Sequence, residues 1–318
     1  MRILIAEPEN FSEKALATLR TAGRVECRAI RQRELKQAMG VYDVIWIRLG
    51  LEVAVDDVPV KPRCRYIVTA TTGIDHLDLD VIAKAGMKCI SLRGHDKFLK
   101  TISSTAELAL GLLISLVRNI PSACASVLKG NWNRDGFRGI QLEGLTIGIV
   151  GCGRLGRKLA SYCNALGLNV LFYDPYVEGM SISGIKVPSL DLLLKRSDIV
   201  SLHVKLTEET SGMIGRKQFA IMKKGAYLVN TSRGDVIVES ALLSALKSGH
   251  LAGAALDVLS GEPGIDGRHV LVSYARKHNN LIITPHIGGA TADAMAKCED
   301  YLAEVLVKRF NTRGRDIR

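Results

Sequence analysis

Apolar runs alternate with amphipathic stretches along most of the chain. Short β-branched or apolar runs near the amino terminus, such as RILIA, VIWI, YIVTA and KCISL, alternate with helical patterns such as FSEKALATLRTAG and LDVIAKAG. A second series begins with LTIGIV near residue 145 and runs through six predicted strands to NNLIITPHI. Strands that alternate with helices of about ten to fifteen residues form mostly parallel, doubly wound sheets. The pattern predicts an α/β protein with two such sheets.

Two helical segments flank the second series. Residues 103–120 are apolar nearly all round, which is typical of a buried or interface helix, and Pro121 marks a break after them. The pattern at 291–309 has Asp293 in its first turn and no strand after it. This last helix must therefore dock on a domain that is already formed.

Length and composition are those of a globular protein with two domains. At ~150 residues per domain, 318 residues predict about two. We place residues 1–98 with 291–318 in one domain and residues 99–290 in the other. Hydrophobic residues make up 47% and charged residues 24%, and no run approaches the ~20 apolar residues of a membrane span.

The amino terminus and the cysteines favour the cytoplasm. MRILIAEPEN has no apolar run of signal-peptide length. The cysteines are odd in number and form no C-x-x-C pair, which argues against a disulfide framework and against a metal site. We expect reduced thiols, mostly in the core, at Cys27, Cys64, Cys89, Cys124, Cys152, Cys163 and Cys298.

A net charge of +11 raises nucleic acid, membrane surfaces and small anions as partners. The last twelve residues, VKRFNTRGRDIR, carry five basic residues and one acid, and the other charges are dispersed. No basic stripe is interleaved with aromatic residues, which make up only 5% of the chain. The charge therefore favours a small anionic ligand, with no nucleic acid or membrane partner.

A glycine-rich turn, GCGRLG, follows the predicted strand LTIGIV and opens a predicted helix. This context is the one that a dinucleotide-binding fingerprint requires. Gly151 would permit the tight turn, Gly153 the approach of the backbone to a pyrophosphate, and Gly156 the packing of helix on strand. The amides of Arg154 and Leu155 would face the phosphates. Residues 99–290 are therefore predicted to form a Rossmann domain.

Asp174 ends the next predicted strand, eighteen residues after Gly156. A carboxylate at this place accepts hydrogen bonds from the adenosine ribose and repels a 2′-phosphate. The sequence therefore predicts NAD, and not NADP, as the cofactor.

Several blocks of this sequence resemble the D-isomer-specific 2-hydroxyacid dehydrogenases. They are GCGRLG with Asp174, SDIVSLHVKLTEETSGMI, the stretch from YLVNTSRGD to DVLSGEP, ITPHIGGAT, TTGIDHLDLD and STAE. GNWNRDGFRGIQLEGLTIGIVG and VIWIRLG are similar to segments of the phosphoglycerate dehydrogenase branch. The resemblance implies a flavodoxin-like substrate domain with the Rossmann domain inserted in it, and a homodimer built on the Rossmann domains.

The resemblance also implies three catalytic residues. Arg233 would bind the substrate carboxylate and carbonyl, His286 would transfer the proton, and Glu262 would orient His286. The chemistry agrees, because imidazole titrates near neutrality and a neighbouring carboxylate favours its charged form. A guanidinium matches a carboxylate with two parallel hydrogen bonds.

Further binding residues follow from the same blocks. The resemblance implies that Asp257 holds the nicotinamide carboxamide and that Thr231 lines that pocket, although Asp257 alternatively only caps a turn. His203 either flanks the cofactor or is simply packed at a strand end, and Gly288 and Thr72 complete the predicted cofactor site.

Two segments of the first domain are predicted to meet the substrate. Thr72, Gly73 and Ile74 would present backbone amides to its carboxylate, or else form a plain turn. Arg48 would read a second anionic group, a phosphate or carboxylate, or else lie on a surface loop.

The sequence departs from the family pattern at several places. Thr71 and Lys205 stand where glycine and proline are frequent, and residues 264–280 are longer than usual. Residues 93–105 replace the usual loop and add cations that either meet a second anionic group or are solvated. These cations are Arg93, His95, Lys97 and Lys100.

Two classes of function are compatible with these residues. The first is a dehydrogenase acting on a D-2-hydroxy acid/2-oxo acid pair, possibly phosphorylated as in 3-phosphoglycerate. The second is an NAD(H)-sensing interaction protein resembling the C-terminal-binding corepressors, which share the fold and the triad. We favour the enzyme, because a corepressor would need an added partner groove or extensions.

Overall fold

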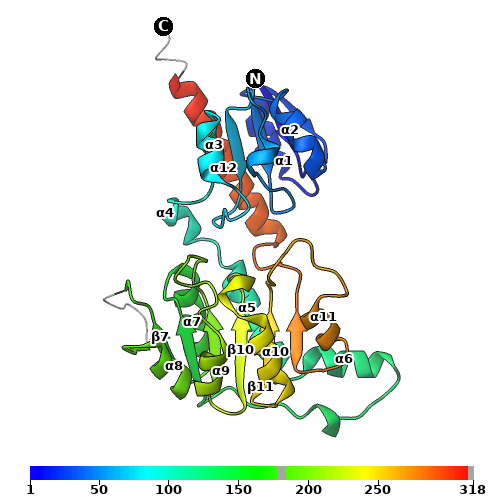
Figure 1. Cartoon of the computed structure of the whole chain (residues 1–318), viewed down its shortest axis with the longest axis vertical. Coiled ribbons are helices and arrows are strands. Elements are labelled where there is room, and N and C mark those ends of the chain that lie inside the picture. The colour runs from blue at the N-terminus through cyan, green and yellow to red at the C-terminus, as the bar shows by residue number, and fades with distance from the viewer. Residues whose placement is uncertain (178–183, 314–318) are drawn as a thin grey trace. The chain divides into compact units, whose positions relative to one another are not determined.

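A computed structural model describes residues 1–177 and 184–313. The chain forms two compact units (Figure 1). Unit 1 combines Met1–Ile102 with Ala290–Arg318, and unit 2 is the continuous segment Ser103–Gly289.

Unit 1 contains a five-stranded, all-parallel sheet in the order β2-β1-β3-β4-β5. Its strands are β1 (Arg2–Ile5), β2 (Arg24–Cys27), β3 (Val44–Ile47), β4 (Tyr66–Thr69) and β5 (Lys88–Ile90). Its helices are α1 (Glu13–Arg20), α2 (Gln32–Met39), α3 (Leu79–Lys84), α4 (Asp96–Leu99) and α12 (Ala292–Arg313), with a 3₁₀ turn η1 (Val55–Asp57). This strand order is the flavodoxin-like one, in which the order reverses between β1 and β3. The predicted fold class is confirmed for this unit.

Helices cover both faces of this sheet. One face packs with α1 and α12 in a core that includes Leu19 and Leu302, and the other packs with α2 and α3 around Leu35 and Ile82. The central strands β3 and β4 are buried at every residue, as parallel strands between two helical layers are.

Unit 1 extends to Ile102, four residues beyond the expected boundary. Leu99 and Ile102 are buried in the core beneath α1 and α12, and Phe98 packs against that core. The short helix α4 therefore belongs to unit 1.

Unit 2 contains a seven-stranded, all-parallel sheet in the order β12-β11-β10-β9-β6-β7-β8. Its strands are β6 (Thr146–Val150), β7 (Asn169–Tyr173), β8 (Ile185–Lys186), β9 (Ile199–Leu202), β10 (Ala226–Asn230), β11 (Leu251–Leu256) and β12 (Leu281–Ile283). Its helices are α5 (Ser104–Val117), α6 (Ile120–Leu128), α7 (Arg154–Ala165), α8 (Leu190–Arg196), α9 (Arg216–Ile221), α10 (Glu239–Lys247) and α11 (Val270–Ala275). Two 3₁₀ turns, η2 (Asp135–Phe137) and η3 (Gly234–Val236), complete the unit. The strand order reverses between β6 and β9, the place where Rossmann sheets bind dinucleotides.

The helices of unit 2 form two layers. Buried residues of α8, α9, α10 and α11 pack on one face of the sheet, and those of α5 and α7 pack on the other. The apolar stretch Asp96–Val117 is long enough to cross a membrane by length and composition. It is divided between α4 and α5, however, and α5 packs against β10, β11 and β12 as a core helix. Pro121 lies in the first turn of α6 rather than in a continuation of α5.

The hydrophobic pattern missed the short helices α4, α6, α8, α9 and α11 and three further elements with little apolar signal. Strand β2 is half-exposed and half-polar (RVEC), α2 has only Leu35, Ala38 and Met39 buried, and β8 is two exposed residues long. Edge strands and polar helices carry little apolar signal, so the prediction of six strands in unit 2 was one short.

Candidate active site

The glycine-rich turn joins β6 to α7 as the fingerprint predicts. Gly151 has a φ of 90°, which a glycine adopts without strain. A Cβ at Gly156 would lie 2.2 Å from the carbonyl oxygen of Gly151, so no larger residue fits there. Gly153 is the N-cap of α7, and a Cβ there would meet no atom within 4 Å. The turn therefore leaves room in front of the amino terminus of α7, where Arg154 and Leu155 begin the helix.

Asp174 lies directly after β7 and touches this turn. One carboxylate oxygen accepts a hydrogen bond from the Cys152 amide at 2.8 Å, and the other accepts one from the Tyr176 amide at 2.9 Å. The side chain is only partly buried. Both oxygens keep a lone pair for a further donor, so the carboxylate is available to a ribose.

Glu262 and His286 form a pair. Glu262 follows β11 and His286 follows β12, and Glu262 Oε1 lies 3.0 Å from His286 Nδ1. Both side chains are about one-quarter exposed, at 26% and 27%. A carboxylate on Nδ1 orients the ring and leaves Nε2 for exchange of a proton with a ligand.

The backbone of His286 is held by Asp257, which is buried at the end of β11. The Asp257 carbonyl oxygen accepts the His286 amide at 2.8 Å, and one carboxylate oxygen accepts the Ile287 amide at 2.9 Å. The other carboxylate oxygen accepts the Gly288 amide at 2.7 Å, and the Thr284 hydroxyl donates to the first. His286 has a φ of 53°, so this set of bonds stabilises a turn that a histidine rarely adopts.

Burial raises the pKa of Asp257, and the hydrogen bonds from Thr284, Ile287 and Gly288 oppose that shift. The predicted role of Asp257 toward a carboxamide stays a prediction. Its observed contacts are those of the capping alternative.

Arg233 follows β10 and shares its loop with two buried polar residues. Its guanidinium donates to the Ser232 carbonyl at 2.7 Å. The side-chain Nδ2 of Asn230 donates to the Arg233 carbonyl at 2.9 Å, and its Oδ1 accepts from the Ser232 backbone amide at 2.9 Å. Asn230 therefore fixes the backbone of this loop. The sequence did not single it out, and the signal that could have found it is a polar side chain at the end of the apolar run AYLVN.

Thr231 and His203 are also near the carboxyl ends of strands. Thr231 Oγ1 is buried and has no hydrogen-bond partner among the described residues. His203 Nε2 lies 2.8 Å from the Ser201 hydroxyl, and burial lowers the pKa of His203 to about 4. The His203 carbonyl oxygen would lie 2.6 Å from a Cβ at Gly151, so its backbone forms one wall of the glycine-rich turn.

The residues of unit 2 fit a dinucleotide. A bound cofactor would use the open space at Gly153 and the buried Thr231 hydroxyl, which no described residue bonds. The lack of space for a side chain at Gly156 keeps the first turn of α7 close to the glycine-rich turn. Gly288 is less tight than Gly156, since a Cβ there would lie 3.0 Å from Asp257 and from Thr105.

In unit 1, Thr72, Gly73 and Ile74 lie in the loop after β4. Ile74 is buried, Gly73 is partly buried and Thr72 is exposed. The hydroxyl of Thr71 donates to the Gly73 carbonyl at 2.6 Å and lies 3.1 Å from the Thr69 hydroxyl. The departure from glycine at Thr71 therefore adds a side chain that braces the loop.

Arg48, after β3, has internal partners. Its guanidinium donates to Glu299 of α12 and to the Glu9 carbonyl, each at 2.7 Å. The carboxylate of Glu299 is 1% exposed and also accepts the Ser12 amide. Arg48 does not lie on an open surface loop, since its side chain is 19% exposed. Its observed contacts are those of an ion pair that joins α12 to the loops after β1 and β3.

Some side chains of the cationic segment 93–100 make contacts within unit 1. His95 Nδ1 lies 2.8 Å from the Tyr301 hydroxyl, and Phe98 stacks on the Tyr301 ring at 4.1 Å. Arg93 Nε lies 3.4 Å from the Thr72 carbonyl. Lys97 and Lys100 are exposed. The solvated alternative fits these two lysines.

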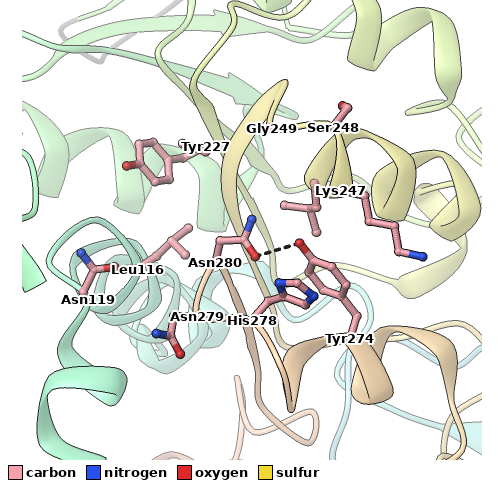
Figure 2. Close-up of a pocket in the computed structure, with 12 residues that line it drawn as sticks. Leu116, Asn119, Tyr227, Lys247, Ser248, Gly249, Tyr274, His278, Asn279 and Asn280 are labelled. Carbon is pink, nitrogen blue, oxygen red and sulfur yellow. Dashed lines mark hydrogen bonds between the residues drawn. The ribbon is translucent and has the colours of Figure 1, made fainter. Parts of the chain in front are cut away.

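The long segment 264–280 contains α11 and folds onto the sheet, because Leu271 and Tyr274 are buried in the core of unit 2. A cavity of about 530 Å³ lies beside its end (Figure 2). Tyr227, Ala252 and Asn280 line it at the starts of β10, β11 and β12. It is therefore at the opposite edge of the sheet from His286 and Arg233, and it contains none of the predicted site residues.

Residues 110–288 match the family described as D-isomer specific 2-hydroxyacid dehydrogenase, NAD binding domain. The chain is 36% identical to the D-3-phosphoglycerate dehydrogenase of Archaeoglobus fulgidus, over 96% of this chain and 57% of that protein. It is 32% identical to the hydroxypyruvate reductase of Thermotoga maritima, over 97% and 98%. The chain thus spans little more than half the length of the phosphoglycerate dehydrogenases that it matches.

Solved structures give the same result. The TT0316 protein from Thermus thermophilus superposes with a TM-score of 0.83 at 31% identity, covering 96% of this chain and 95% of that one. D-lactate dehydrogenase from Aquifex aeolicus, complexed with NAD and lactic acid, gives 0.84 at 27% identity, covering 99% and 97%. The chain belongs to the D-isomer specific 2-hydroxyacid dehydrogenase family and contains its NAD-binding domain, which confirms the resemblance and the predicted cofactor.

Proposed function

We propose that this protein is an NAD-dependent dehydrogenase that interconverts a D-2-hydroxy acid and the corresponding 2-oxo acid. The observation that supports it most strongly is the Glu262–His286 pair, 3.0 Å apart, placed after β11 and β12 in the same unit as Arg233 and the glycine-rich turn. Ligands of doubly wound sheets bind at these carboxyl ends. Unit 2 is the NAD-binding domain in this proposal, and unit 1 is the substrate-binding domain.

When bound, NAD supplies a hydride acceptor for the C2 hydrogen, and NADH supplies the hydride in the reverse direction. Gly151, Gly153, Gly156 and the first amides of α7 would hold its pyrophosphate, and Asp174 would hold its adenosine ribose. Thr231 and Asp257 would line the nicotinamide end.

The chain's own residues handle the proton and the charge. His286 Nε2 accepts the hydroxyl proton when the hydroxy acid is oxidised and returns it to the carbonyl oxygen on reduction. Glu262 stabilises the protonated ring between these events. Arg233 binds the carboxylate and polarises the carbonyl, which a lysine would do only as a point charge.

The substrate is proposed to be a short D-2-hydroxy acid of the phosphoglycerate or hydroxypyruvate type. Similarity to relatives with these names supports it. The amides of Thr72, Gly73 and Ile74 would take the substrate carboxylate. The ion pair with Glu299 leaves Arg48 less suited to a second anionic group than the exposed Lys97 and Lys100.

We further propose a homodimer in the cytoplasm. Unit 2 exposes several large apolar side chains on and after α6, which a second copy of the chain would cover in the proposed dimer. These are Ile120, Val127, Leu128, Trp132 and Ile140. None of the seven cysteines, all of which lie in the described part of the chain, forms a disulfide, as is usual in a reducing compartment.

The test is a screen of 2-oxo acids with NADH, in which oxidation of NADH is measured as the loss of absorbance of the reduced nicotinamide. The set includes glyoxylate, hydroxypyruvate, pyruvate and 3-phosphohydroxypyruvate. Oxidation of NADH with at least one of them supports the proposal. Tight NADH binding without turnover of any of them would favour the NAD(H)-sensing interaction protein.

A further inference from the structure

The loop that carries Arg233 and the loop that carries Glu262 are in direct backbone contact. Gly234 follows Arg233, and a Cβ on it would lie 2.1 Å from the carbonyl carbon of Leu259 and 2.2 Å from the Ser260 nitrogen. Glu262 comes two residues after Ser260. The spacing of the two candidate catalytic side chains therefore depends on how firmly Ser260 is held against the Arg233 loop.

Glu239, the first residue of α10, holds Ser260 in place. Its Oε1 accepts the Ser260 amide at 2.9 Å, and its Oε2 lies 3.2 Å from Nε2 of His269. The Ser260 hydroxyl donates to the carboxylate of Asp235, one residue beyond Gly234. The Glu239 and His269 side chains are 15% and 17% exposed, so solvent screens their contact little.

His269 belongs to the long segment 264–280, and its two ring nitrogens have different tasks. Nδ1 accepts the Leu271 amide at 3.3 Å and thereby caps α11. Because Nδ1 is an acceptor, the ring proton lies on Nε2 and points to Glu239. The long segment is thus attached to the carboxylate that fixes Ser260.

We propose that Glu239 is a positioning residue for the candidate active site, supported by His269, and that it sets the geometry of Glu262 relative to Arg233. This inference rests on the proposed dehydrogenase function. Glu239 and His269 touch neither the glycine-rich turn nor the described contacts of Asp174. We call the contacts of Glu239 with the Ser260 amide and with His269 the brace. Loss of the brace should affect turnover and substrate binding, and not cofactor binding.

Four single variants of the chain and one double variant separate the contacts of Glu239 from general stability. Glu239→Ala removes both contacts, whereas Glu239→Gln keeps an acceptor oxygen for the Ser260 amide. His269→Ala removes only the support, and Ser240→Ala, the next and exposed position of α10, is the control. Each is assayed for 2-oxo acid reduction at 25 °C, and the exchange of the Ser260 amide with deuterium is measured.

Because misplacement of catalytic groups is costly, we expect kcat to fall about tenfold or more in Glu239→Ala, with the KM for NADH within about twofold. Glu239→Gln restores kcat to within about threefold, and Ser240→Ala changes nothing. His269→Ala gives an intermediate loss, and the Glu239→Ala/His269→Ala double variant is no worse than Glu239→Ala alone, as for residues of one network. The Ser260 amide exchanges fast only where kcat falls.

Unchanged kcat in Glu239→Ala despite fast exchange at Ser260 would overturn the inference. If that variant does not fold, equal kcat in the parent, Glu239→Gln and His269→Ala, with Ser260 exchange accelerated in His269→Ala, overturns it as well. A parent protein that reduces no 2-oxo acid refutes the proposed function, and the brace is then judged from exchange at Ser260 alone.

Discussion

At the scale of single residues, the candidate site depends on side chains that hold backbone as much as on those that face a ligand. Asp257 uses its carboxylate on the Ile287 and Gly288 amides and its carbonyl on the His286 amide. Asn230 does the same for the loop of Arg233. The backbone geometry of the candidate site is therefore fixed by hydrogen bonds within and between the loops after β10, β11 and β12.

The lowered pKa of His203 predicts a pH-dependent stability. Between an unfolded pKa of about 6.5 and the folded value of about 4, the unfolded chain binds a proton that the folded chain does not. The free energy of unfolding should therefore fall as the pH falls from 6.5 to 4, by up to about 3 kcal/mol from this residue. Urea unfolding at pH 7.5 and 4.5 measures it.

In His203→Gln this part of the pH dependence should vanish, whereas the exposed His278→Gln should keep it. The same loss of stability on acidification in the parent and in His203→Gln would contradict the assignment.

Asp174 predicts the choice between the two dinucleotides. In Asp174→Ala, loss of two hydrogen bonds to the ribose should weaken NADH binding about tenfold or more, since charge-assisted bonds contribute ~1.5–3 kcal/mol. Loss of its charge should also bring NADPH binding closer to that of NADH. Titration of nicotinamide fluorescence measures both affinities.

The matched control is Asp191→Ala, which removes an exposed carboxylate from the first turn of α8 and should change neither affinity. A parent protein that binds NADPH as tightly as NADH would refute the predicted preference for NAD over NADP.

At the scale of elements, the apolar pattern predicted the central strands and the helices around them, because these are buried on long, regular faces. It missed β2, α2 and β8, whose residues are polar or few, and the short helices α4, α6, α8, α9 and α11. The glycine spacing after an apolar run was enough to predict the turn between β6 and α7 and the place of Asp174 after β7. The pairing of Arg48 with Glu299, 251 residues apart, and the bracing by Asp257 and Glu239 have no signal in local spacing.

The ion pair between Arg48 and Glu299 links the loop after β3 to α12. Removal of Arg48 should therefore lower the free energy of unfolding. Arg48→Ala leaves the Glu299 carboxylate, 1% exposed, without its cation. Breaking a buried pair in this way typically costs about 3–5 kcal/mol, and we expect the lower part of that range because Arg48 is partly exposed. Thermal unfolding of the parent and the variant measures it.

Arg268→Ala, which breaks an exposed pair with Asp266, should cost less than about 1 kcal/mol. If Arg48→Ala instead keeps its stability but loses activity only toward phosphorylated or dicarboxylic substrates, then Arg48 reads a second charge.

At the scale of the whole molecule, the proposed dimer explains the apolar side chains on and after α6. Leu128 is 88% and Trp132 is 90% exposed in one chain. The double variant Leu128→Asp/Trp132→Ser should therefore be monomeric at micromolar concentration, where the parent is a dimer by light scattering.

Val60→Asp, at a fully exposed position of unit 1, should leave the dimer intact. A monomeric parent protein would refute the proposed assembly.

The division of unit 1 into two segments has a consequence for the order of folding during synthesis. Helix α12 packs against Phe11 and α1 through three fully buried residues, Leu302, Ala303 and Leu306. In the chain, the whole of unit 2 lies between α1 and α12. Unit 2 is continuous and has all its own strands before α12 leaves the ribosome. We expect it to reach its native state first, while one face of the sheet in the nascent unit 1 is covered by α1 without α12, because contacts this distant in sequence form late.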